Sequence, residues 1–326
     1  MENDEMAKLF EEWNKGELES FLIEITAKIL AKKDDLTDDG YVVDKILDKT
    51  GMKGTGRWTV QEAAEQSVAA PSIAAALDSR YVSGRKSERE AASKILEGPK
   101  DLPPVDKEQL ISDLKKALYC AKVTSYAQGL GIIKAASDKK DWNVDLSLCS
   151  KMWRGGCIIR AQLLNKITAA LERDSNLANL LVDPTFASEI NERHMAWRRV
   201  VSVGVASGIA TPALSASLGY YDQYRRDRLP ANLIQGQRDF FGGTLCVPVC
   251  ANDFALLYVY SLSLPPSAVA NTPDLSFPHK IPLIHTVLLI PGHTYERTDR
   301  EGTFHCLWDD THKDIGDLAG RTAGEM

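Results

Sequence analysis

A glycine-rich segment holds the sharpest chemical signal in this sequence. Residues 51–59 read GMKGTGRWT. The glycines expose backbone N–H groups, Lys53 and Arg57 bring positive charge, and Thr55 offers a hydroxyl, so the segment has the parts of an anion cradle. Arg80, farther along the chain, could give the same anion a bidentate guanidinium. The alternative interpretation is a solvated turn, with Arg80 as a surface ion-pair residue.

Other catalytic chemistries leave no comparable pattern. The G-x-G pairs at residues 54–56 and 129–131 lack a third glycine and follow no strand-like run, so we expect no dinucleotide fold in this chain. A phosphate loop of the G-x-x-x-x-G-K type and a zinc helix of the H-E-x-x-H type are also missing. Cys246 and Cys250 are separated by three residues without a second matching pair, so we expect no metal site.

Helical periodicity fills the chain as far as Phe241, and strand-like alternation is scarce. Thr59 and Glu62 form a capping-box pair that predicts a helix start at Val60. Proline stands at the start of four other expected helices, where its missing N–H costs nothing. We therefore predict an all-α body of about ten helices. The clearest of them cover residues 17–32, 41–48, 60–67, 71–80, 106–139, 184–205, 212–226 and 230–241.

Two arginine-containing motifs admit structural interpretations. Residues 152–160 read MWRGGCIIR, and we interpret their two glycines as sites of close packing inside an apolar helical run. Trp197 is expected in the core, while Arg198 and Arg199 are expected to form salt bridges on the opposite side.

Composition limits the possible partners. The chain has 326 residues and a formal charge of −6, so no whole-molecule field would attract nucleic acid. Its most apolar region, residues 244–291, is interrupted by prolines before it reaches the length of a membrane helix. The N-terminal segment is acidic and has no apolar stretch, so we expect no signal sequence there. Six scattered cysteines are typical of a reducing compartment, so we expect a cytoplasmic protein. From the net charge and the interrupted apolar region, we expect neither a nucleic-acid nor a membrane partner.

Four segments make the sequence similar to a known enzyme family. Residues 10–26 read FEEWNKGELESFLIEIT, 53–59 read KGTGRWT, 152–160 read MWRGGCIIR, and 229–239 read LPANLIQGQRD. In this order they resemble the helical C-terminal domain of decarboxylating 6-phosphogluconate dehydrogenases, over roughly residues 4–242. The resemblance resumes at residues 293–305, HTYERTDREGTFH, which look like the family's C-terminal tail.

The resemblance implies a homodimeric enzyme of the oxidative pentose phosphate pathway. Such an enzyme oxidises 6-phosphogluconate at C3 with NADP, releases CO2 from the β-keto acid, and tautomerises the enediol to ribulose 5-phosphate. The family's general base, a lysine, and its general acid, a glutamate, lie on a helix that precedes the matched segments. Neither they nor the NADP-binding domain have a counterpart here, so the resemblance assigns no catalytic residue and implies that this chain alone is inactive.

The resemblance also implies five substrate-binding residues. Lys53, Thr55 and Arg80 match residues that hold the substrate phosphate, in agreement with the anion cradle inferred from the segment itself. Arg238 and His293 match residues that reach the active site of the partner subunit in family dimers.

One departure divides the expected domains. The family runs from the residue matching Arg238 to the one matching His293 in a few positions, whereas 55 separate them here. We therefore predict a helical dimerisation and substrate-binding domain at 1–242, an atypical proline-rich insert at 243–291 and a tail at 292–326. Because the insert is nearly uncharged and lacks helical periodicity, we hypothesise a retained intron or a gene-model error.

Two alternatives accompany the leading hypothesis. The chain could be a non-catalytic paralogue or fragment that only dimerises, which loss of 6-phosphogluconate binding would favour. It could also resemble a related β-hydroxyacid dehydrogenase with another substrate, but Lys53 and Arg80 argue for a phosphate.

Overall fold

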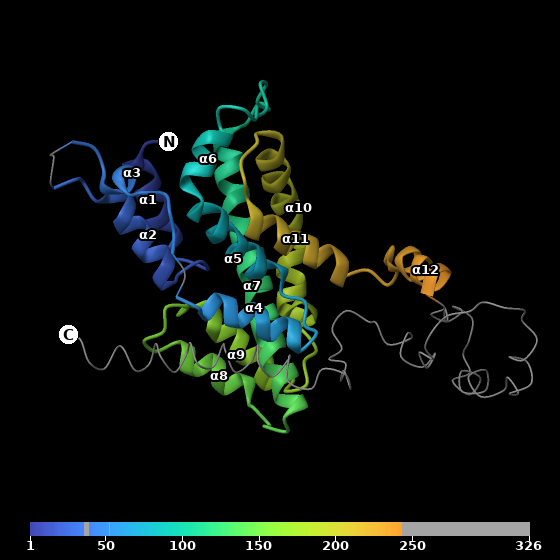
Figure 1. The fold of residues 1–326 in the computed structure, drawn as a ribbon. Helices are drawn as coiled ribbons and strands as arrows, with labels where there is room; N and C mark the ends of the chain where they lie inside the picture. The colour runs from blue at the N-terminus through green and yellow to red at the C-terminus, as the bar shows by residue number, and fades with distance from the viewer. Residues whose placement is uncertain (36–38, 52, 243–326) are drawn as a thin grey trace, which may run out of the picture. The chain divides into compact units, whose positions relative to one another are not determined.

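The computed structural model describes residues 1–35, 39–51 and 53–242 (Figure 1). The chain divides into two compact units, Met1–Asp227 and Arg228–Met326, which are described separately. Every regular element among the described residues is a helix, and only isolated β-bridges join extended segments, such as Ser20 with Ala161. The predicted all-α class is therefore confirmed. The predicted insert at 243–291 and the tail at 292–326 lie outside the described residues.

The first unit contains twelve helices, counted over the described residues. They are α1 Asn3–Trp13, α2 Phe21–Ala31, α3 Val42–Lys45, α4 Thr55–Glu65, α5 Pro71–Gly84, α6 Lys86–Ala92, α7 Lys107–Lys139, α8 Leu146–Trp153, α9 Leu163–Arg173, the 3-10 helix η1 Leu180–Val182, α10 Pro184–Ala206 and α11 Pro212–Tyr224. In the second unit, α12 spans Ala231–Gly242. The proline-led starts of α5, α10 and α11 are as predicted, because each proline occupies a position whose N–H has no intrahelical partner.

The long helix α7 runs through the middle of the first unit, beside α10 (Figure 1). Its 33 residues extend for about 50 Å. The Asp106 side chain caps its start by accepting a hydrogen bond from Gln109 N, as the predicted start at residue 106 requires. Because α5, α8, α10, α11 and η1 all contact α7, this helix is the scaffold that positions the rest of the unit.

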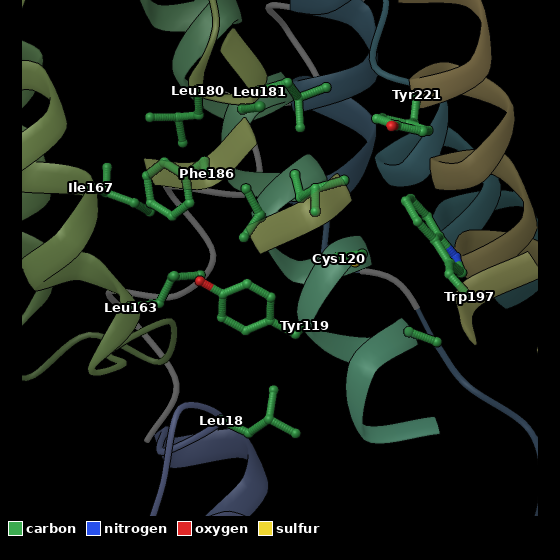
Figure 2. Close-up of a cluster of buried hydrophobic side chains, with 14 of the residues drawn as sticks. Leu18, Tyr119, Cys120, Leu163, Ile167, Leu180, Leu181, Phe186, Trp197 and Tyr221 are labelled. Carbon is green, nitrogen blue, oxygen red and sulfur yellow. The ribbon is translucent and has the colours of Figure 1, made fainter. Parts of the chain in front are cut away.

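The hydrophobic core forms where α7, α9, α10, α11 and η1 meet (Figure 2). Its fully buried large side chains include Leu18, Tyr119, Leu163, Ile167, Phe186 and Trp197. The Trp197 indole also donates a hydrogen bond to Leu214 O at 3.2 Å, which satisfies its polar atom. Burial raises the pKa of the Cys120 thiol in this core to about 12, so the thiol is unreactive at neutral pH.

A buried polar cluster joins three helices. Gln128 of α7 accepts a hydrogen bond from Ser72 N of α5 at 3.0 Å and donates one to Ser72 Oγ at 2.9 Å. The Ser72 hydroxyl lies 2.6 Å from the hydroxyl of Ser217 on α11. All three side chains are buried. Their mutual pairing meets the requirement that buried polar groups find partners.

The predicted start of the helix at residues 60–67 is wrong. Helix α4 begins five residues earlier, at Thr55, and Gly54 is its N-cap residue. The expected capping box is not formed, because Thr59 Oγ1 donates to Thr55 O at 2.8 Å inside the helix. The helix predicted at 41–48 is shorter than expected and spans only Val42–Lys45. The earlier start of α4 places its N-terminus directly on the glycine-rich segment.

The two arginine motifs have different outcomes. The interpretation of Gly155 and Gly156 as close-packing sites is wrong, because α8 ends at Trp153 and an added Cβ at either glycine would meet nothing within 4 Å. Gly156 instead has φ +75°, a turn conformation that favours glycine. The second interpretation is confirmed: Trp197 is buried, and both neighbouring arginines form salt bridges.

Candidate functional site

The segment before α4 lies against the C-terminal half of α5. Thr50 N donates to Ser83 Oγ at 3.1 Å, and the two hydroxyls lie 2.7 Å apart. Arg80 Nη2 donates to Gly51 O. The structure therefore brings the predicted anion segment and Arg80 together, although they are 29 positions apart in sequence.

Backbone conformation requires glycine at the start of α4. Gly54 has φ +104°, and an added Cβ would lie 3.1 Å from the Trp58 ring. Trp58 N donates to Gly54 O at 2.9 Å in the first helical hydrogen bond. The N–H groups of Thr55, Gly56 and Arg57 therefore have no partner within the helix, which leaves the positive end of its dipole available to an anion.

The first turn of α4 packs directly on α5. An added Cβ at Gly56 would lie 3.3 Å from Leu77 Cδ1, so this glycine permits close approach of the two helices. Leu77 is buried, and Arg80 lies one turn farther on the same face of α5. Lys53 and Thr55 are both exposed at this end of α4. The three predicted phosphate-binding residues in the first unit, Lys53, Thr55 and Arg80, are thus all exposed where α4 and α5 meet. We call Lys53, the buried Gly54 and Thr55 the anion loop.

A second set of contacts near the anion loop was not predicted. Arg89 of α6 donates to Asp48 Oδ2 at 3.2 Å, Asp48 O at 3.0 Å and Ser83 O at 3.2 Å. Lys86 Nζ lies 2.6 Å from Asp48 Oδ1. Hydrogen bonds from Lys86 and Arg89 hold the pKa of the Asp48 carboxyl below its usual value. No local motif marks Asp48 and Arg89, because they are 41 positions apart and meet only in the folded chain.

The structure does not describe the side chains of the other predicted residues. Arg238 belongs to α12 in the second unit, with its side chain outside the described residues, and His293 lies outside them altogether. Cys246 and Cys250 also lie outside them. Within residues 1–35, 39–51 and 53–242, no group of three or more His, Cys, Asp or Glu side chains could hold a metal ion. No helix in those ranges is long and apolar enough to cross a membrane.

Residues from the two segments 10–26 and 152–160 line a polar cavity of about 400 Å³. The segment around Phe21 and the segment around Arg160 line it, and Phe21 N donates to Arg160 O at 3.1 Å. The Arg160 guanidinium lies 3.9 Å from the centre of the Phe21 ring, a cation–π contact. Residues 10–26 and 152–160 therefore form one structural unit around this cavity.

Comparison with known proteins identifies the family. Residues 1–246 match the family described as "6-phosphogluconate dehydrogenase, C-terminal domain". The chain is 50% identical over 307 residues to "6-phosphogluconate dehydrogenase, decarboxylating 1" of Oryza sativa subsp. japonica, covering 94% of this chain and 54% of the relative. It is 56% identical over 247 residues to "6-phosphogluconate dehydrogenase, decarboxylating 1" of Spinacia oleracea, covering 74% of this chain and 51% of the relative.

A solved structure has the same fold. The 6-phosphogluconate dehydrogenase of Plasmodium falciparum, described in apo form and with its cofactor NADP+ and its substrate 6-phosphogluconate, superposes with a TM-score of 0.74. It is 40% identical in sequence, and the match covers 78% of this chain and 54% of that one. The chain thus spans about half the length of the relatives it matches. Together with the helical fold, these matches show that the chain belongs to the 6-phosphogluconate dehydrogenase C-terminal domain family.

Proposed function

We propose that this chain is the substrate-binding and dimer-forming part of an NADP-dependent, decarboxylating 6-phosphogluconate dehydrogenase. The observation that carries the proposal is the hydrogen bond from Arg80 to Gly51 O, which joins α5 to the anion loop. It gathers a lysine, a hydroxyl, free helix N–H groups and a guanidinium in one region. Those groups suit the phosphate of 6-phosphogluconate.

Each group has a distinct task in this proposal. Lys53 supplies a compact positive charge, and Thr55 supplies a hydroxyl at the positive end of α4. Arg80 has five N–H donors, so its bond to Gly51 O leaves others for the phosphate oxygens. Arg238 and His293 would complete the site from the partner subunit of a homodimer, as the family resemblance implies.

NADP does not fit the residues that the structure describes. A dinucleotide site needs a strand, a glycine-rich turn and a helix, and residues 1–35, 39–51 and 53–242 contain no such unit. We therefore assign no step of hydride transfer or decarboxylation to a residue of this chain. In the proposal, oxidation at C3 depends on a nucleotide-binding domain like that of the related enzymes, and the chain alone is inactive.

Alignment coverage supports treating residues 243–291 as an insertion between the helical domain at 1–242 and the tail at 292–326. The rice alignment reaches 94% of this chain and the spinach alignment 74%, yet the two cover 54% and 51% of the relatives. The added fifth of this chain thus brings very little additional length of a relative. A mass-spectrometric peptide from within 244–291 of the native protein would refute the hypothesis of a retained intron or a gene-model error.

The proposed homodimer follows from the family resemblance, in which Arg238 and His293 match residues that reach the active site of the partner subunit. Sedimentation velocity tests the proposal: a monomer at micromolar concentration would refute it. A dimer that binds no 6-phosphogluconate would favour the alternative of a non-catalytic dimerising paralogue or fragment.

A cytoplasmic location is the corresponding proposal for the compartment. The three cysteines within the described part of the chain, Cys120, Cys149 and Cys157, are free, which fits a reducing compartment. Fractionation of source cells tests it. Recovery of the native protein in chloroplasts, the location named for some relatives, would refute it.

Titration calorimetry tests the substrate proposal. We expect the chain to bind 6-phosphogluconate and to bind gluconate, which lacks the phosphate, at least tenfold more weakly. Lys53→Ala should reduce affinity for 6-phosphogluconate at least tenfold. Lys8→Ala, which removes an exposed lysine on α1, is the charge-matched control and should leave affinity unchanged. Equal affinity for both ligands, or an unaffected Lys53→Ala variant, would refute the proposal.

A further inference from the structure

We propose that Arg89 is a positioning residue for the anion loop, acting through Asp48 and Ser83. The proposal rests on the proposed function, because it explains how the phosphate-binding groups reach their places. Arg89 lies on α6, and within the described part of the chain its side chain forms hydrogen bonds with Asp48 and Ser83 and an ion pair with Asp48, but neither with Lys53 or Thr55. Its role is to hold the chain segment that leads into the loop.

The contacts of Arg89 connect two segments. Its Nη2 atom donates to Asp48 O at 3.0 Å and to Ser83 O at 3.2 Å, while Nη1 donates to Asp48 Oδ2 at 3.2 Å. One guanidinium thus joins the segment before the loop to the last turn of α5. The carbonyl of Ser83 lies at the negative end of that helix, where a cation is favoured.

The partial burial of the Arg89 side chain indicates that its contacts are a specific part of the fold. The Arg89 side chain is 31% exposed, whereas its neighbour Arg85 is 68% exposed. Arg89 Nε is buried and has no hydrogen-bond partner among the described residues. The orientation of the guanidinium is therefore determined by its Nη bonds to Asp48 and Ser83, which must offset the loss of hydration at Nε.

Successive anchors then restrict the loop. Asp48 is held by Arg89 and also by Lys86 at 2.6 Å. Two residues later, Thr50 is held by Ser83, and Gly51 is held by Arg80. With three anchored residues in the four positions 48–51, little freedom remains for Lys53 and Thr55 to leave the start of α4. Loss of the Arg89 contacts with Asp48 should let residues 48–51 sample other conformations. The fraction of molecules in which the anion loop is placed to bind phosphate should then fall.

A lysine cannot reproduce these contacts. The planar guanidinium presents two Nη groups in a fixed fork, and here they reach a carboxylate and two carbonyls at once. An ammonium on a flexible stem retains the charge without that geometry. The conservative change Arg89→Lys therefore separates positioning from simple charge attraction.

The experiment compares Arg89→Ala, Arg89→Lys, Lys53→Ala and the control Arg85→Ala in the full chain. Arg85 matches Arg89 in charge, and its side chain pairs with Glu88, which is exposed, and with no other charged group in the described part of the chain. We measure affinity for 6-phosphogluconate by calorimetry and hydrogen exchange of backbone amides by mass spectrometry. We expect Arg89→Ala to weaken binding about tenfold, Arg89→Lys to restore less than half of that change on a logarithmic scale, and Arg85→Ala to have no effect.

Hydrogen exchange provides a readout that a general loss of stability would not reproduce. In Arg89→Ala, exchange should rise in the peptide covering residues 46–58 and stay unchanged in peptides from α7. Wild-type exchange in 46–58, or wild-type affinity, in Arg89→Ala would overturn the proposal. A uniform rise across α7 would also overturn it, since Arg89 would then support the whole domain. Failure of the unaltered chain to bind 6-phosphogluconate would refute the proposed function, while the exchange data would still decide whether Arg89 holds the segment.

Discussion

The ion pair between α10 and α11 gives a quantitative prediction. Arg198 donates from Nη1 to Asp222 Oδ2 at 2.7 Å and from Nη2 to Asp222 Oδ1, and Arg225 Nε donates to the same carboxylate at 2.9 Å. We consider the substitution Asp222→Asn, which preserves the size of the side chain but removes its negative charge. It should weaken the connection between these two helices beside the core.

The magnitude follows from the carboxyl pKa. Hydrogen bonding to Arg198 is the largest cause that lowers the Asp222 pKa, from 3.8 to about 2. At about 1.4 kcal/mol for each pH unit, the difference corresponds to about 2.4 kcal/mol. The Asp222 side chain is 29% exposed, so solvent screening reduces the expected effect to about 1 kcal/mol. Asp222→Asn should therefore lower the free energy of unfolding at pH 7 by about 1 kcal/mol.

The pH dependence fixes the sign of the effect. Because the folded pKa is depressed, the stabilisation is complete above the unfolded value near 3.8 and disappears as pH falls through about 2. Urea unfolding followed by circular dichroism should show the full difference between wild type and Asp222→Asn at pH 7 and almost none at pH 2. Asp138→Asn, which removes an exposed pair with Lys134, is the control and should change stability by less than about 0.5 kcal/mol. An equal difference at both pH values, or no difference at pH 7, would refute the reasoning.

Two further predictions concern the core and its edge. Phe186 is completely buried in the core cluster (Figure 2). Phe186→Ala should therefore lower the free energy of unfolding by about 3–5 kcal/mol. A loss below about 1 kcal/mol in urea unfolding would contradict its place in the core. Burial is the main cause that lowers the pKa of His194, followed by the Arg198 charge. The unfolded chain therefore takes up a proton first as pH falls below about 6.5, so stability declines there, and His194→Gln should flatten this decline. An unchanged slope between pH 5 and 7 in urea unfolding of His194→Gln would contradict that assignment.

Sequence reasoning was most successful where one residue type carries one local consequence. Proline at the start of α5, α10 and α11 and Asp106 before α7 predicted helix starts that the structure confirms. Helical periodicity as far as Phe241 predicted the all-α fold in the same way. Each of these signals depends on a few neighbouring residues, so no knowledge of the folded chain was needed.

The errors arose where a local signal competed with tertiary structure. Thr59 and Glu62 have capping-box spacing, yet α4 starts at Thr55 because Gly54 adopts a positive φ against the Trp58 ring. The glycines after α8 were expected to permit helix packing but instead form a turn. The anion loop and Arg80 were predicted as a pair, whereas the anchoring by Asp48, Ser83 and Arg89 was not. Such pairings connect residues that are distant in sequence, and a single sequence carries no local trace of them.

The buried cluster of Ser72, Gln128 and Ser217 has a consequence for the register between helices. If α5 slid along α7 by one residue, about 1.5 Å, the amide of Gln128 would lose both of its hydrogen bonds to Ser72 while remaining buried. Purely apolar helix surfaces tolerate small slippage, whereas this contact disfavours other alignments because they would leave buried polar groups unpaired. Arg80 lies eight residues after Ser72 on α5. The hydrogen bonds between Ser72 and Gln128, about two turns away, therefore help to set the position of Arg80 along the α7 axis.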